Sequence, residues 1–172
     1  MNTEATHPHA GATHPHAGRS MRRKAREMTE PAEIESVLQG EMLMHLAMSQ
    51  NNVPFLVPVY FGWDGEALYF HSANAGSKID ILRANPEVCF EISSVAGFIE
   101  AGEACDFEAR HRTVIGFGRA VFVEDEAEKI RALELIVAHF TTQHFEYPKD
   151  NLAKTFVIRI DVHSMKGKQH GF

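Results

Sequence analysis

The chain has 172 residues, of which 44% are hydrophobic and 23% charged, and its formal net charge at pH 7 is -6. This composition is typical of one globular domain with a core, and the length makes a second full domain unexpected. The negative charge argues against nucleic acid as the main partner, because proteins that follow a phosphate backbone normally carry a basic excess. No apolar run is long enough to cross a bilayer, and no secretory-type segment begins the chain, so the sequence predicts a cytoplasmic protein without a membrane partner.

The N-terminal residues differ in composition from the rest. Residues 5–18 are two identical copies of Ala-Thr-His-Pro-His-Ala-Gly, and a basic cluster follows between Arg19 and Arg26. Proline and glycine in each copy disfavour a helix, so we expect residues 1–27 to form a disordered tail. Its four histidines are potential metal ligands, but a flexible segment implies no fixed coordination geometry, and we predict no metal site.

We expect the folded domain to span residues 28–172. A helix-start signal, Thr29-Glu30-Pro31, precedes a helix that Gly40 ends, and an apolar strand follows from Met42 to Met48. The next strand, from Phe55 to Phe61, is apolar on both faces, which predicts that it is buried on two sides.

Pro58 is the most informative residue of this second strand. Proline has no N–H to donate to a ladder, so one side of the strand at this point must face something other than a neighbouring strand. A flat ligand lying against the strand would meet that requirement, and so would a β-bulge.

The next stretch combines a strand, a loop of small residues and a helix. The turn Trp63-Asp64-Gly65 leads into a strand over Glu66–Ser72, and Asn85-Pro86 ends the helix that follows the loop. His71 lies at the end of the strand, where the loop begins. Backbone N–H groups at the start of the helix, together with the charge of Lys78, predict a site for an anion such as a phosphate.

The following residues predict a strand, a long loop and a second strand. The first strand covers Glu87–Ser94, the loop runs from Val95 to Arg110, and the second strand covers Val114–Val123. A loop of this length in a compact domain is usually functional or disordered. Glycine within the second strand, at Gly116-Phe117-Gly118, indicates close approach of a ligand or of another backbone.

The C-terminal part predicts one helix after Asp125 and a final strand over Phe156–Val162, with residues 165–170 as a tail beyond it. This makes six strands joined mostly by hairpins. Such a pattern predicts a mainly β (α+β) fold, a small six-stranded antiparallel barrel with helices outside it.

The polar residues in these positions favour one kind of site. Hydrolase, zinc-protease and dinucleotide-binding motifs are not found in the sequence. The remaining candidates combine hydroxyl and cationic donors with apolar walls, which is the inventory of a site for a phosphorylated aromatic cofactor. They are Pro58, His71, Ser72, Ser77, Lys78, Arg112 and Thr113.

Several segments form a combined pattern, namely Val57-Pro58-Val59-Tyr60, Leu68–Ala73 with Gly76-x-Lys78, Asn85-Pro86-x-Val88-x-Phe90, Val114-Ile115-x-Phe117-Gly118-x-Ala120, Met21-Arg22-Arg23 and Met165-x-Gly167-Lys168. Together they resemble the split-barrel flavoproteins related to pyridoxamine 5'-phosphate oxidase, and among these the 5-nitroimidazole-resistance (Nim) proteins. The resemblance covers residues 21–170. The Arg-rich C-terminal substrate motif of true pyridoxamine phosphate oxidases is missing, so that activity is not expected.

The resemblance implies a six-stranded split barrel and a homodimer with a flavin at its interface, usually FMN, with FAD also possible. It places Val57, Pro58 and Val59 along the isoalloxazine, His71 and Ser72 near the ring and ribityl chain, and Ser77 and Lys78 at the phosphate. The other cofactor-binding residues that it implies are Phe70, Arg112, Thr113 and Val114. His71 is the expected catalytic residue.

The sequence thus predicts an FMN-dependent oxidoreductase, similar to a nitroreductase, whose small-molecule substrate is an electron-poor aromatic such as a nitroimidazole. The alternative is a non-catalytic split-barrel protein that binds flavin or haem, with His163 or His170 as axial haem ligands.

Overall fold

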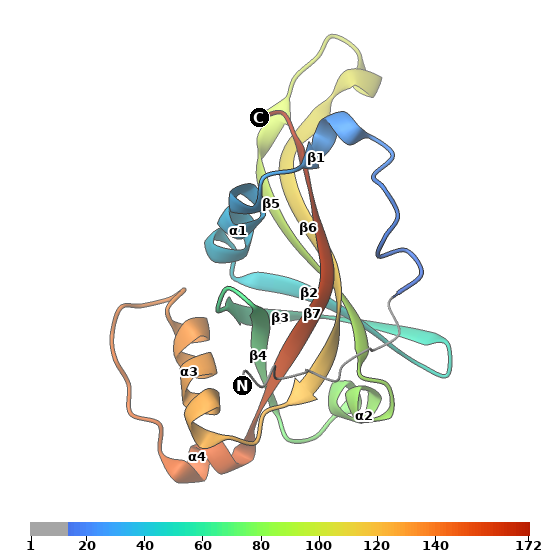
Figure 1. Ribbon diagram of the computed structural model, residues 1–172. Coiled ribbons are helices and arrows are strands. Elements are labelled where there is room, and N and C mark those ends of the chain that lie inside the picture. Colours follow the sequence, from blue (N-terminus) through green and yellow to red (C-terminus); the bar gives the residue numbers. More distant parts are fainter. Residues whose placement is uncertain (1–13) are drawn as a thin grey trace, which may run out of the picture.

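The computed structural model describes residues 14–172, so the first 13 residues of the tail expected to be disordered over residues 1–27 lie outside the described part. At the other end of that tail, residues 24–27 belong to a short 3₁₀ turn and to the first strand, where β7 supplies hydrogen bonds that the composition of the tail does not reveal. Strands β2 to β7 form a closed antiparallel ring in the order β7-β4-β3-β2-β5-β6, in which β6 pairs back onto β7 (Figure 1). The prediction of a six-stranded antiparallel barrel with peripheral helices is confirmed. The strands are β1 (Glu27–Met28), β2 (Leu43–Gln50), β3 (Val53–Trp63), β4 (Ala67–Ala73), β5 (Glu87–Ile99), β6 (Glu108–Phe122) and β7 (Thr155–His170).

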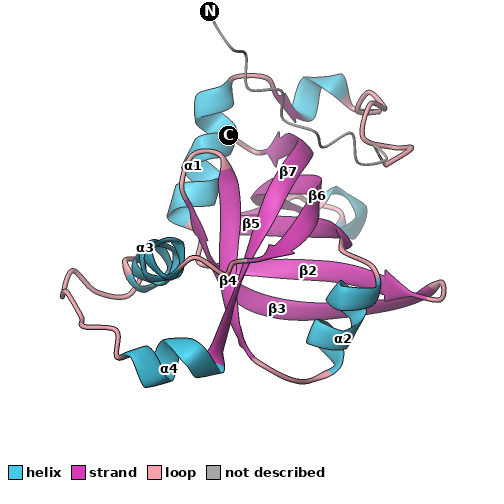
Figure 2. Ribbon diagram, turned by 60° about the horizontal axis from the view of Figure 1, so that its bottom comes forward, coloured by secondary structure: helices cyan, strands magenta, loops and turns pink. Residues whose placement is uncertain are grey.

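The helices lie outside the strands (Figure 2). None of those in residues 14–172 is long and apolar enough to cross a membrane. The six-residue α4 lies directly before β7. The helices are α1 (Pro31–Gly40), α2 (Ser77–Ala84), α3 (Glu126–Val137) and α4 (Lys149–Lys154), with two short 3₁₀ turns, η1 (Lys24–Arg26) and η2 (Ala104–Asp106).

The interior of the ring is closely packed with apolar side chains. Phe61, Phe70 and Phe90 are fully buried there, and they come from three different strands. Burying an aromatic side chain of this size contributes about 1.5–3 kcal/mol. The ring therefore encloses a core, and ligand sites must lie on its outside or at an opening between strands.

Strand β3 is joined to its two neighbours very unequally. It pairs with β2 over eight residues, from Val53 to Tyr60, but with β4 only over three, from Phe61 to Trp63. The two asparagines of the β2–β3 turn, Asn51 and Asn52, have φ angles of 52° and 63°, which suit a tight two-residue hairpin. Most of one edge of β3 is thus left open, and this opening is the split in the barrel.

Pro58 lies on the open edge. The N–H of Phe61 donates to the carbonyl of Met42 at 3.2 Å. Because hydrogen-bonded and non-hydrogen-bonded pairs alternate in an antiparallel ladder, the nitrogen of Pro58, which is opposite His45, points away from β2. The inference that this side of the strand faces no neighbouring strand is therefore correct.

The expected burial of β3 on two sides is wrong. Side chains of its outer face are exposed, Leu56 at 62% and Tyr60 at 50%, whereas Val59 and Phe61 of the other face are buried. Alternation along the strand sends one apolar set into the core and the other set outward, where the described residues leave it largely exposed, apart from an edge-on contact between Tyr60 and Phe140.

Two predicted non-strand segments belong to strands. The long loop expected from Val95 to Arg110 is reduced to the connection between Ile99 and Glu108, because β5 and β6 continue as a paired hairpin past a register shift between Val95 and Phe98. The residues expected to form a C-terminal tail belong to β7, which pairs with β6 on one side and with β1 on the other. Partner strands supply hydrogen bonds that the local sequence does not reveal.

The glycines of β6 serve packing within the protein. A Cβ at Gly116 would collide with the ring of Phe90, and a Cβ at Gly118 would lie 2.6 Å from the carbonyl oxygen of Asp161 in β7. The ladder between β6 and β7 shifts register between Phe117 and Gly118. The close approach that these glycines indicated is thus made by the protein's own side chain and backbone.

The substitution Gly118→Ala is expected to lower the free energy of unfolding by about 1–3 kcal/mol, since the added methyl group meets the backbone of β7 rather than a flexible side chain. Denaturant unfolding of the two proteins measures this. Gly40→Ala is the matched control, because nothing lies within 4 Å of its Cβ position. Equal stability of all three proteins would contradict the packing role.

Candidate functional site

The end of β4 and the start of α2 bring three predicted site residues together. The ammonium of Lys78 lies 5.4 Å from the ring centroid of Phe70. His71 follows Phe70 at the point where β4 leaves the core and is exposed. Although the residue is exposed, neighbouring groups shield part of its imidazole from water, and this partial burial lowers the pKa of His71. The nearby charge of Lys78 lowers the pKa further. The imidazole is therefore held in its neutral form next to a cation.

The first turn of α2 has open hydrogen-bond donors. Gly76, with a φ of 118°, precedes the helix and makes no side-chain cap. The N–H groups of Ile79 and Asp80 donate to the carbonyl of Gly76, at 2.9 and 3.2 Å. The N–H groups of Ser77 and Lys78 precede the first helical hydrogen bonds, so with the side chains of these two residues they form a donor set suited to an anion.

The predicted cofactor-binding residues on the strands differ in the solvent exposure of their side chains. Pro58 is exposed and Val57 half-buried, whereas the side chains of Val59, Phe70 and Val114 lie in the core. These three residues cannot contact a ligand through their buried side chains. They could contact it only through their backbone atoms, or support the exposed residues that do.

Arg112 and Thr113 are not close to His71 within one chain. Strand β7 is paired with both regions, His71 being opposite Val157 and Arg112 opposite Gln169. These two β7 positions are twelve residues apart, which is about 40 Å along a strand. A single chain therefore divides the predicted cofactor residues into two groups, one at each end of β7.

The guanidinium of Arg112 has a hydrogen-bond donor without a partner among the described residues. Its Nε atom is buried without a hydrogen-bond partner among the described residues, and its guanidinium lies 4.2 Å from the ring centroid of Phe172. An unpaired buried donor is costly unless another group meets it. This is the kind of position that a ligand or a partner chain completes.

A series of side-chain hydrogen bonds that was not predicted from the sequence lies on the outer face of the sheet. His45 Nδ1 lies 3.0 Å from the carboxylate of Glu91, which accepts from the hydroxyl of Ser93, and the hydroxyls of Ser93 and Thr113 lie 3.1 Å apart. Alternation in β2 was the available signal, because it places His45 on the face opposite the buried Met44. This series of hydrogen bonds orients the hydroxyl of Thr113, one of the predicted site residues.

The two histidines considered as haem ligands have different surroundings. His170 Nε2 hydrogen-bonds to the carboxylate of Glu108, which also pairs with Arg26 at 3.0 Å. His163 is half-buried and borders a cavity of about 390 Å³. Of the two, His163 has the imidazole that the described residues leave more available.

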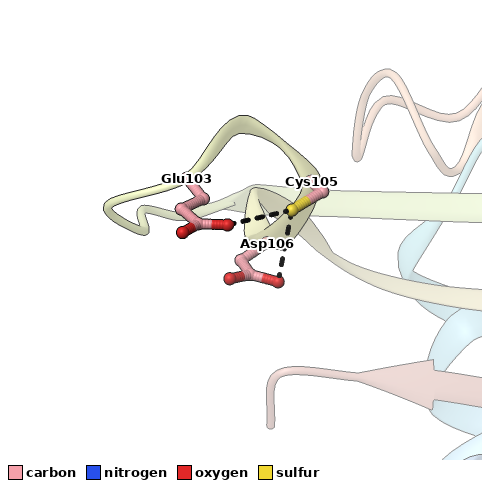
Figure 3. A group of neighbouring side chains, drawn as sticks. All are labelled: Glu103, Cys105 and Asp106. Atoms are coloured by element: carbon pink, nitrogen blue, oxygen red, sulfur yellow. Dashed lines mark hydrogen bonds between the residues drawn. The ribbon is translucent and has the colours of Figure 1, made fainter.

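A third group of side chains lies at the end of the β5–β6 hairpin. The thiol of Cys105 is 3.7 Å from the carboxylate of Glu103 and 3.8 Å from that of Asp106 (Figure 3). All three residues are exposed. Exposed carboxylates that already accept from a neighbouring thiol are well solvated, and we assign them no ligand.

Comparison with models of known protein families shows which family this chain belongs to. The family model described as pyridoxamine 5'-phosphate oxidase matches residues 30–169. The chain belongs to the pyridoxamine 5'-phosphate oxidase family. The resemblance proposed from the sequence motifs is therefore confirmed, and the family domain covers both groups of predicted cofactor residues.

Solved structures share this fold. A candidate 5-nitroimidazole antibiotic resistance protein from Bacteroides thetaiotaomicron VPI-5482 is 29% identical, covers 83% of this chain and 85% of its own, and has a TM-score of 0.74. The flavocytochrome Anf3 from Azotobacter vinelandii is 23% identical, with coverage of 89% and 73% and a TM-score of 0.78. The FAD and heme binding protein from Mycobacterium smegmatis is 16% identical, with coverage of 86% and 74% and a TM-score of 0.76. At the last two identities the likeness concerns the fold alone.

Among curated proteins, the uncharacterized protein RA0666 from Rhizobium meliloti (strain 1021) is 34% identical over 64 residues. The match spans 37% of this chain and 42% of that protein. Less than half of the relative's length is therefore covered.

Lys78→Gln is expected to raise the pKa of His71 toward, but not fully to, its ordinary value, since the charge is removed while burial remains. Titration of the imidazole by NMR measures this. Because the folded state binds this proton more weakly than the unfolded chain, His71 makes stability fall as the pH drops through the ordinary histidine range, and the loss should be smaller in the variant. Lys149→Gln is the control, and a pKa of His71 that is unchanged in Lys78→Gln would contradict the proximity of the two groups.

Proposed function

We propose that this protein is a flavin-dependent oxidoreductase that binds FMN and reduces a small electron-poor aromatic compound such as a nitroimidazole. The observation that carries the proposal is the grouping of His71 and Lys78 at the open start of α2, next to a barrel split that Pro58 keeps unpaired. Family membership supports a flavin-binding role. The relative at 29% identity, named for 5-nitroimidazole resistance, supports this class of substrate.

The donor set at α2 suits the phosphate of FMN. The N–H groups of Ser77 and Lys78, the hydroxyl of Ser77 and the ammonium of Lys78 would serve as donors to that anion. Pro58 and Val57 offer an apolar edge for the isoalloxazine, while His71 and Ser72 supply polar contacts to the ring and the ribityl chain. FAD contains the same riboflavin phosphate unit, so these donors would serve it as well.

A homodimer would bring the two groups of cofactor residues together. One chain places Arg112 and Thr113 too far along β7 to share a ligand with His71, but a two-fold related copy can present its own pair to that site. Apolar side chains on the outside of the barrel supply a surface for such a contact. They are Leu56 at 62%, Tyr60 at 50%, Val95 at 66% and Phe98 at 74% exposure.

The residues of this chain would bind and orient the substrate. Reduced FMN, when bound, would supply the electron pair and return to its oxidised state. Reduction of a nitro group to a nitroso group takes two electrons and two protons, and both protons end on the oxygen that leaves as water. Since burial and Lys78 lower the pKa of His71, its imidazole is neutral near pH 7, and we assign it the role of donating a hydrogen bond to a nitro oxygen. Any proton that the reduced flavin does not deliver comes from solvent.

The purified protein is expected to show the absorbance bands of a flavin, with FMN released on denaturation. After photoreduction without oxygen, mixing with a 5-nitroimidazole should restore the oxidised bands, and His71→Ala, which removes the hydrogen-bond donor, should slow this step by about 10²-fold. Stopped-flow absorbance measures the rate. His71→Asn, which retains a hydrogen-bond donor, should slow the step less than His71→Ala.

A protein that stays colourless after addition of FMN and FAD would contradict the proposal. Bound flavin that no nitroaromatic reoxidises would favour the non-catalytic alternative. A Soret band on addition of haem, lost in His163→Ala, would favour haem binding instead.

The homodimer predicts a native mass of twice the 19.3 kDa of one chain. Leu56→Asp is expected to shift the protein to a monomer and to weaken flavin binding at least about tenfold, since a charge would be buried in an apolar contact. Light scattering and flavin fluorescence measure the two effects. Phe145→Asp, at another exposed apolar position, is the control, and a monomeric wild-type protein with full flavin content would rule out the shared site.

A further inference from the structure

Four polar side chains cross the outer face of three neighbouring strands. His45 of β2 is opposite Glu91 of β5. Ser93, two residues further along β5, is opposite Thr113 of β6. Directly opposite residues of an antiparallel pair place their side chains on the same face of the sheet, and so do residues two apart in one strand. The four side chains therefore form one continuous series on the outside of the barrel.

The direction of each hydrogen bond in this series follows from the donors that are available. An ionised carboxylate can only accept, so Glu91 accepts from Nδ1 of His45, 3.0 Å away, and from the hydroxyl of Ser93. A serine hydroxyl has a single hydrogen, and that of Ser93 is directed at Glu91. The hydroxyl oxygens of Ser93 and Thr113 lie 3.1 Å apart, so the hydrogen between them belongs to Thr113. The hydroxyl of Thr113 thus has lone pairs, but no hydrogen, left for a further partner.

The side chain of Thr113 is open to a ligand. Thr113 is half-buried and borders a cavity of about 340 Å³ on the outside of β6 and β7. Its neighbour across the β6–β7 ladder is Lys168, which is itself opposite Glu27 of β1. Within residues 14–172, the hydroxyl of Ser93 is the only hydrogen-bond partner of the Thr113 side chain. A ligand that meets this hydroxyl must therefore bring a hydrogen-bond donor.

We infer that Thr113 accepts a hydrogen bond from the flavin, and that Glu91 and Ser93 are positioning residues that set this polarity. The inference rests on the proposed function, in which Thr113 reaches a flavin held by the second copy of the chain. The donors of oxidised FMN are the ring N3–H and the ribityl hydroxyls, whereas its carbonyl oxygens and ionised phosphate oxygens accept. Thr113 therefore contacts the ring N3–H or a ribityl hydroxyl and does not bind the phosphate.

Flavin binding to the full-length protein, followed by the change in flavin fluorescence, tests the acceptor. Thr113→Val should weaken FMN binding about tenfold, because a flavin donor loses its partner, and Thr113→Ser should retain most of the affinity. Two analogues identify that donor: 3-methyl-FMN lacks the ring N3–H, and an analogue with a phosphopentyl chain lacks the ribityl hydroxyls. One of them should bind the wild-type protein at least about tenfold more weakly than FMN, and Thr113→Val should reduce this difference about tenfold.

The positioning residues are tested by the same difference in affinity between FMN and the weaker analogue. Ser93→Ala and Glu91→Ala release the hydroxyl of Thr113 and should each reduce the difference at least about threefold. Glu91→Gln retains an acceptor oxygen for Ser93 and should restore it. A purely structural role would weaken FMN and the analogue alike and leave the difference unchanged. Ser36→Ala, at an exposed serine of α1, is the matched control and should change neither affinity.

Two results would overturn this inference while leaving the proposed function standing. One is FMN binding that is unchanged in Thr113→Val, or a difference between FMN and both analogues that this variant does not reduce. The other is a difference that stays at its wild-type size in Ser93→Ala and Glu91→Ala, which would remove the positioning role. A wild-type protein that binds no flavin would contradict the proposed function and this inference together.

Discussion

The limited pairing between β3 and β4 is the constraint on which the rest of the structure depends. Only three residues of β3, from Phe61 to Trp63, join it to β4, whereas eight residues, from Val53 to Tyr60, pair with β2. Pro58 has no N–H to offer along the open edge, so a complete ladder there would lack a hydrogen bond. The ring still closes because the 16-residue β7 pairs with both β4 and β6. An opening therefore exists in a barrel that remains closed and packed elsewhere.

The opening explains why the polar groups gather at the end of β4. Once β4 separates from β3 its side chains leave the core, and His71 follows the fully buried Phe70 directly. The chain then turns at Gly76 into α2, whose first N–H groups and Lys78 face the same region. Hydrogen-bond donors and a cation next to an unpaired strand edge suit an anionic ligand with an apolar part. Our proposal of a flavin enzyme follows from this arrangement, in a protein whose family is established.

The length of β7 divides the molecule into two regions with different roles. Its first half supports β4 beneath the proposed flavin site, and its second half pairs with the part of β6 that carries Arg112 and Thr113. These two regions are twelve β7 residues apart, which is why the proposed flavin site needs a second copy of the chain to bring them together. The described residues before β1 lie against the same part of the barrel, since the ring of His14 stacks on Phe117 and the carbonyl of Arg19 accepts from Lys166.

The sequence by itself determined the family, the antiparallel barrel, the turn signals and the strand–loop–helix around His71, because these depend on local periodicity and on residues with narrow backbone preferences. It also determined that one edge at Pro58 lacks a partner strand. Only the tertiary structure decided that β5, β6 and β7 extend through segments expected to be loops, since their hydrogen bonds come from distant residues. It likewise decided that Gly116 makes room for a core side chain and that Arg112 lies far from His71. Distance within a sheet depends on register and strand length, and neither can be read from residues considered one segment at a time.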